Sequence, residues 1–90
     1  MYEAVQFIEA KAGADPVETV LGEYGDEIDA VAAARRAKAE FALTGSDVYA
    51  WWIVRETGAR LANFIADSKS TKEFVLDLSS GELVEAPSWR

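Results

Sequence analysis

Residues 26–43 read DEIDAVAAARRAKAEFAL, and this stretch decides the fold because it predicts the helix around which the rest of the chain is organised. Asp26 is placed to cap the helix, and Glu27 and Asp29 put negative charge on the first turn, where the helix dipole favours it. The following run is rich in alanine, the strongest helix former. Gly45 supplies the stop, because glycine readily adopts the left-handed conformation that ends a helix. Helical spacing places these side chains on one face: Ala30, Val31, Ala34, Ala37 and Phe41.

The segment after the helix, DVYAWWIVRE at residues 47–56, predicts a strand because aromatic and β-branched residues dominate it. Side chains alternate between the two faces of a strand. One face takes Tyr49, Trp51 and Ile53, and the other takes Ala50, Trp52 and Val54. Large apolar groups on both faces predict that this strand lies at the centre of a sheet.

Two strands are predicted before the helix, over residues 1–10 and 17–24. In the first, Val5 and Phe7 point to one face, and Tyr2, Ala4 and Ile8 point to the other. The second segment also fits a short helix with Asp15 as N-cap and Pro16 in its first turn. We favour a strand that folds back on the first, because β-formers dominate residues 17–21 and Gly22 and Gly25 would interrupt so short a helix.

Further strands are predicted over residues 60–67, 73–78 and 82–85, joined by polar or glycine-containing turns. Such hairpin connections imply an antiparallel sheet. The predicted fold is therefore a single α+β domain over residues 1–90, in which an antiparallel sheet of about five strands packs in two layers on one Ala-rich helix. The predicted order is β-β-α-β-β-β with a short last strand, and residues 86–90 form a C-terminal tail.

One helix leaves the second face of the sheet uncovered. The helix spans about 26 Å, at about 1.5 Å for each of its roughly 17 residues, so it covers one face. Trp51 and Trp52 point to opposite faces, and one of them therefore lies on the uncovered side. An exposed apolar patch with tryptophan is typical of a contact surface, and a symmetric homodimer is the commonest assembly. The alternative is that a bent sheet or the tail, through Trp89, covers this face. The candidate interface residues are Trp51, Trp52 and Trp89.

Composition excludes several kinds of chemistry. The 90 residues contain no cysteine and no histidine, which removes disulfides, thiolate nucleophiles, Ser-His-Asp triads and the usual zinc ligands. The net charge of −7 disfavours direct binding to nucleic acid or to an anionic membrane surface. The sequence has no recognisable secretory signal and no apolar run long enough to span a bilayer, so we expect a cytoplasmic protein. From the composition we expect neither a cofactor nor a metal.

The remaining polar motifs have structural interpretations, and we predict no catalytic residue. Ser68-Lys69-Ser70 contains a serine beside a lysine, but it lies in a predicted turn. Asp77 is flanked by apolar residues and is predicted to form a structural ion pair with Arg55 or Arg60. The basic cluster Arg35-Arg36-Ala37-Lys38 is interpreted as a solvated helix face.

Three functions fit these observations. The first is a protein-interaction or assembly module, most simply a homodimer that uses the apolar sheet face, with itself or another protein as partner. The second is an acidic decoy whose carboxylates imitate phosphates and occupy a nucleic-acid-binding protein. The third is a small enzyme with Asp or Glu as acid–base groups, which the absence of histidine makes the weakest of the three.

Overall fold

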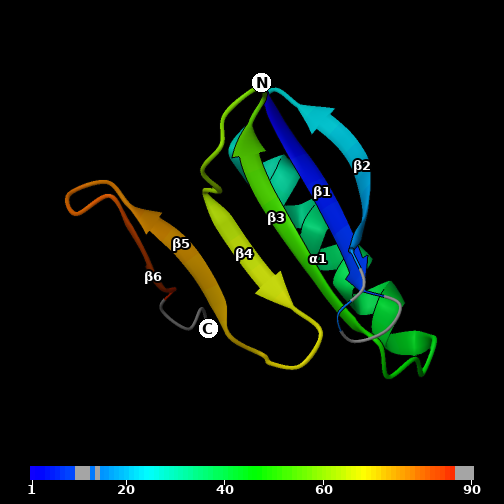
Figure 1. Cartoon of the computed structure of the whole chain (residues 1–90). Helices are drawn as coiled ribbons and strands as arrows, with labels where there is room; N and C mark the ends of the chain where they lie inside the picture. Colours follow the sequence, from blue (N-terminus) through cyan, green and yellow to red (C-terminus); the bar gives the residue numbers. More distant parts are fainter. Residues whose placement is uncertain (10–12, 14, 87–90) are drawn as a thin grey trace.

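The computed structural model describes residues 1–9, 13 and 15–86, which form one sheet and one helix (Figure 1). The elements in chain order are β1 (Tyr2–Glu9), β2 (Val17–Tyr24), α1 (Glu27–Leu43), β3 (Tyr49–Glu56), β4 (Phe64–Asp67), β5 (Glu73–Asp77) and β6 (Glu82–Glu85). All neighbouring strands are antiparallel. The predicted two-layer α+β fold is confirmed, with six strands in place of about five.

The strand order is β2-β1-β3-β4-β5-β6, so the first strand of the chain lies inside the sheet. β2 folds back on β1, and α1 then carries the chain across β1 to β3 on its other side (Figure 1). The segment 17–24 is a strand, as predicted, and it pairs with β1 from Tyr2 opposite Tyr24 to Ile8 opposite Val17. The register shifts between Ala4 and Val5, a bulge that increases the local twist of the edge strand.

The main core lies between α1 and the sheet. The buried helix residues are all alanines, Ala30, Ala33 and Ala34, so the helix backbone lies close to the strands. They pack on a cluster of sheet residues that is fully or almost fully buried: Ala4, Ala50, Trp52, Val54, Phe64 and Ala66. Trp52 fills most of the space that the small side chains leave. Its ring meets Phe41 edge to face at 5.6 Å, and its Nε1 donates a hydrogen bond to Gln6 Oε1 at 2.9 Å.

Two predicted features of the connections are wrong in detail. The strand expected over residues 60–67 begins only at Phe64, because the connection that turns at Gly58, whose φ is +86°, continues through bends to residue 63. Leu61, which we had expected to share a strand face with Ile65, is 67% exposed. Asp26 occupies the predicted N-cap position, but its side chain makes no capping hydrogen bond.

Asp77 was predicted to pair with Arg55 or Arg60, and this is wrong. Its carboxylate accepts hydrogen bonds from the backbone N–H and hydroxyl of Ser79 at 3.0 and 2.8 Å and from the hydroxyl of Ser80 at 3.2 Å. These bonds, led by the Ser79 hydroxyl, lower the pKa of Asp77. The acid therefore organises the turn between β5 and β6, as Asp commonly does at the start of a turn.

An ion pair ties the helix to the outer part of the sheet. Arg35 Nη2 lies 2.7 Å from Glu73 Oε1 and Arg35 Nε lies 2.9 Å from Glu73 Oε2, which is a bidentate pair. The guanidinium carbon also lies 5.7 Å from the centre of the Phe64 ring. The hydrogen bonds from Arg35 lower the pKa of Glu73 below its ordinary value. Glu73 therefore contributes stability above the pKa of an unfolded glutamate, and this contribution is lost as the pH falls through the lowered pKa.

We expect Glu73→Gln to reduce the free energy of unfolding by about 1 kcal/mol at pH 7, a modest value because the side chain of Arg35 is 46% exposed and the pair is partly screened. The difference in unfolding free energy between the variant and the wild type should shrink below about pH 4. There the unfolded wild-type chain carries a neutral glutamate, as the variant carries a neutral glutamine. Urea unfolding at pH 7 and pH 3 measures both values. Glu40→Gln, an exposed position on the same helix, is the control. An equal loss at both pH values would contradict the ion-pair account.

Candidate interaction surface on the open sheet face

The side of the sheet opposite α1 carries an apolar row that crosses five strands. In Figure 1 the helix lies behind β1 and β3, and this open face is turned toward the viewer. Strand register places Val5 between Val20 and Ile53, Ile53 next to Ile65, and Ile65 next to Phe74. The open face is defined here by this row and the aromatic cluster beside it: Val20, Val5, Ile53, Ile65, Phe74, Phe7, Trp51 and Tyr49. Such a row is unusual for a solvated sheet face, which normally carries polar side chains.

Three aromatic side chains form a cluster on the open face. Phe7 and Trp51 lie opposite each other on β1 and β3, and their rings stack with centres 5.2 Å apart and planes 9° from parallel. The ring of Tyr49 lies 5.4 Å from that of Trp51. The Tyr49 hydroxyl donates a hydrogen bond to Asp67 Oδ2 at 3.2 Å, which fixes the cluster to β4. Rings held in this way lose little conformational entropy when a partner packs on them.

Burial on the open face decreases from its centre outward. Val5 is fully buried and Ile53 is 8% exposed, although neither belongs to the core beneath the helix. Phe7, Trp51, Ile65 and Phe74 are half-buried, and Val20 on the edge strand is exposed. The larger side chains therefore shelter the smaller ones and leave part of their own apolar surface open to a partner.

Charged groups border the apolar centre. Arg55 Nε lies 2.7 Å from Glu3 Oε1, and Arg55 Nη2 lies 3.5 Å from Glu18 Oε2. The hydrogen bond to Glu3 is the main cause of the raised pKa of Arg55. At the other end of β3, partial burial and the neighbouring Asp67 raise the pKa of Tyr49. An apolar centre with a polar border is the usual organisation of a protein–protein interface.

The three candidate tryptophans have different positions. Trp51 lies on the open face, whereas Trp52 is completely buried against the helix and belongs to the core. Trp89 lies outside the described residues. The structure adds Phe7, Ile65 and Phe74 to the surface around Trp51, because β1 and β4 pair with β3, and β5 pairs with β4.

Within residues 1–9, 13 and 15–86, no group of three or more Asp or Glu side chains is placed to hold a metal ion. The helix in this part of the chain lacks the length and the apolar character needed to cross a membrane. Comparison with protein-family models, with curated proteins and with solved structures gives no match. Function is therefore inferred from the geometry of the open face.

Proposed function

We propose that this protein is a small protein-interaction module that assembles as a homodimer, with the open faces of two copies packed on each other. The observation that carries the proposal is the apolar row Val20–Val5–Ile53–Ile65–Phe74 with the stacked Phe7 and Trp51 beside it, on the side of the sheet away from the helix. A contiguous apolar patch of this kind marks a contact surface in a folded protein.

The size of the accessible surface supports a second copy as the occupant. The chain exposes 6058 Å² at a mass of 9.8 kDa. A compact monomer of that mass exposes about 5,200 Å², so the excess is about 900 Å². Each partner in an interface of standard size loses about 800 Å². Pairing two copies would thus bring the exposed surface close to that of an ordinary compact protein.

The border charges also support pairing between identical copies. A two-fold axis brings the same patch together from both sides, so a border of one sign would repel itself. Arg55 lies here between the carboxylates of Glu3 and Glu18, and Asp67 lies at the other end of β3. Both signs are present, and Arg55 offsets part of the negative charge of Glu3 and Glu18 within one copy, so the border repels itself less than carboxylates alone would.

Light scattering across a range of protein concentrations tests the proposal, with tryptophan emission recorded on the same samples. We expect a mass of twice 9.8 kDa that falls toward the monomer value on dilution. The emission should shift to the red on dilution, because Trp51 becomes solvated while Trp52 stays in the core. A monomer mass at every concentration would overturn the homodimer and leave Trp51 available to a different partner.

A further inference from the structure

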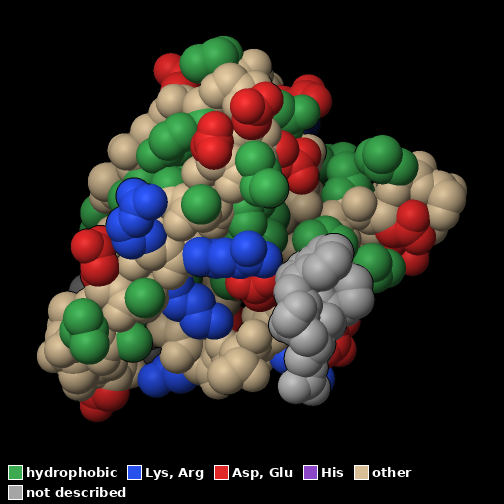
Figure 2. Space-filling model, turned by 180° about the vertical axis from the view of Figure 1, so that it is seen from behind, with side chains coloured by type: hydrophobic (Ala, Val, Ile, Leu, Met, Phe, Trp, Pro, Cys, Tyr) green, Lys and Arg blue, Asp and Glu red, His purple; other side chains and the backbone are tan. Residues whose placement is uncertain are grey.

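Most of the positive charges in the described part of this acidic chain lie on α1 or in the connection between β4 and β5. Of the seven Lys and Arg residues in the described part, five lie on α1 or in the connection between β4 and β5: Arg35, Arg36, Lys38, Lys69 and Lys72. Figure 2, which views the molecule from the helix side, shows Lys and Arg side chains gathered below a region where Asp and Glu side chains dominate. Arg35 is paired with Glu73 and Lys72 with Glu85, so the cations of this group that line the pocket described next are Lys38 and Lys69.

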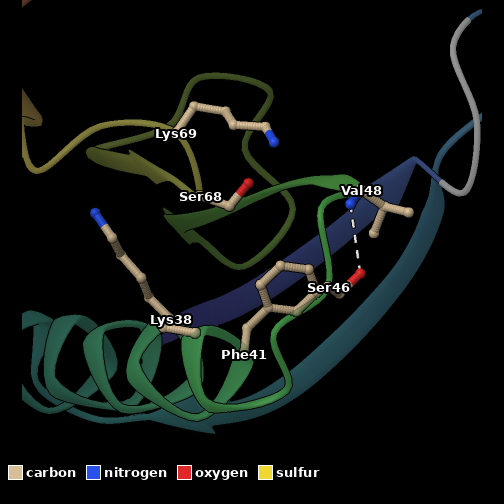
Figure 3. A pocket seen from close by; sticks show the side chains of 7 residues that line it. Lys38, Phe41, Ser46, Val48, Ser68 and Lys69 are labelled. Atoms are coloured by element: carbon tan, nitrogen blue, oxygen red, sulfur yellow. Dashed lines mark hydrogen bonds between the residues drawn. The ribbon is translucent and has the colours of Figure 1, made fainter.

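A pocket opens within this basic region. It lies between the last turns of α1, the loop that leads into β3 and the turn after β4 (Figure 3). Its volume is about 80 Å³, and its lining consists of Lys38, Phe41, Ala42, Ser46, Val48, Ser68 and Lys69. The lining residues include two cations and two hydroxyls but no carboxylate. Since a cavity of roughly 10–15 Å³ by the same measure holds one water, the pocket suits a group of a few heavy atoms.

Each of the two ammonium groups donates a hydrogen bond to a backbone oxygen. Lys38 Nζ donates to the backbone oxygen of Ser70 at 2.6 Å, and Lys69 Nζ donates to the backbone oxygen of Asp47 at 2.9 Å. Both acceptors are neutral carbonyls, so neither bond cancels the positive charge. Each ammonium has three N–H donors and uses one of them here. Figure 3 shows the two lysine side chains on different sides of the pocket.

The serine hydroxyls are also positioned as donors. Ser46 Oγ accepts the N–H of Val48 at 3.4 Å, and Ser68 Oγ accepts the N–H of Ala50 at 2.9 Å. Because each oxygen is used as an acceptor, its own proton remains to be donated. At the end of α1, the carbonyl of Phe41 accepts bonds from the N–H and hydroxyl of Thr44.

We propose that this pocket binds a phosphate group, either as the free ion or as a small phosphomonoester. A phosphate carries close to two negative charges and at least three acceptor oxygens, which suit a pocket lined by ammonium and hydroxyl donors. A planar carboxylate has one charge and two oxygens and would leave donors unused. The apolar wall of Phe41, Ala42 and Val48 can contact the organic part of a monoester. This site lies beside the helix, so it does not depend on the homodimer.

Amide NMR titrations test the site, with inorganic phosphate, phenyl phosphate and sodium acetate added at matched ionic strength. We expect saturable shifts at Ser46, Val48, Ser68 and Lys69 with either phosphate compound and at most weak, non-saturating shifts with acetate. Tighter binding of phenyl phosphate would identify the ligand as a monoester, and equal binding would identify the free ion. The absence of saturation with both phosphates, or the same response to acetate, would overturn the proposal.

Variants separate binding from a purely structural role of the lysines. Ser46→Ala and Lys69→Gln should each weaken phosphate binding at least tenfold, and Arg60→Gln, a cation outside the pocket, should leave it unchanged. Ser46 is exposed, so its variant should unfold at the same urea concentration as the wild type. Unchanged phosphate affinity in a folded Ser46→Ala and a folded Lys69→Gln would overturn the assignment.

Discussion

Trp51→Ser is expected to convert the homodimer into a monomer by weakening self-association about a thousandfold. A central tryptophan of an interface typically contributes about 2 kcal/mol or more, and the symmetric dimer loses two copies, or about 4 kcal/mol in all. Each 1.4 kcal/mol corresponds to about a factor of ten in the dissociation constant. Trp51 lies beside the buried centre of the open face, between Phe7 and Tyr49. Sedimentation velocity of the variant over a range of concentrations measures the change.

Leu43→Ser is the matched control for this prediction. Leu43 is also a large apolar residue and is 87% exposed, but it ends α1 and lies away from the open face. Its replacement should leave the dissociation constant within about twofold of the wild type, because a surface change away from the contact has little effect. A dimer that survives Trp51→Ser, or one that Leu43→Ser disrupts equally, would contradict the placement of the interface.

Trp52→Ala is expected to reduce the free energy of unfolding by about 3–5 kcal/mol, a large part of the 5–15 kcal/mol typical of a whole domain. Trp52 is completely buried, and its removal leaves a cavity that the alanines of α1 are too small to fill. It also leaves Gln6 Oε1 without the hydrogen bond that Nε1 donates. Thermal unfolding should occur roughly 15–30 °C lower, or the variant should be unfolded at room temperature.

The neighbouring residue provides the comparison for this second prediction. Trp51→Ala, measured at a concentration where both proteins are monomers, should cost about 1 kcal/mol, because a half-buried ring loses mainly its contacts with Phe7 and Tyr49. Trp52→Phe keeps most of the volume and should lie between the wild type and Trp52→Ala. Equal destabilisation by Trp51→Ala and Trp52→Ala would mean that both faces of β3 are equally packed within one copy.

The sequence predicted the elements that depend on local pattern. Helical spacing and Gly45 located α1, whose last residue is Leu43. Alternation correctly separated Trp51 from Trp52, and β-forming residues correctly identified β2 over Val17–Tyr24. The identity of the covered face was also present in the sequence, because Ala4, Ala50 and Ala66 share a face with Trp52, and small side chains are what a close-packed helix needs.

Features that depend on distant pairing were beyond the sequence. Alternation shows which side chains share a face of one strand, but it does not show which strands are neighbours. The apolar row through Val5, Ile53 and Ile65 appears only once β1 lies between β2 and β3. The pocket could not be predicted from the sequence for the same reason, because Lys38, Ser46 and Lys69 come from three segments that the fold brings together. Asp77 was misassigned because a turn supplied closer donors than any arginine.

An isotope-filtered NOE experiment on a mixture of labelled and unlabelled copies tests the homodimer interface most directly, because it detects only contacts between different molecules. We predict intermolecular contacts from the indole of Trp51 in one copy to open-face side chains such as Phe7, Ile53 and Ile65 in the other. Intermolecular contacts confined to the edge strands β2 or β6, or none at the highest attainable concentration, would contradict an interface built on the open face.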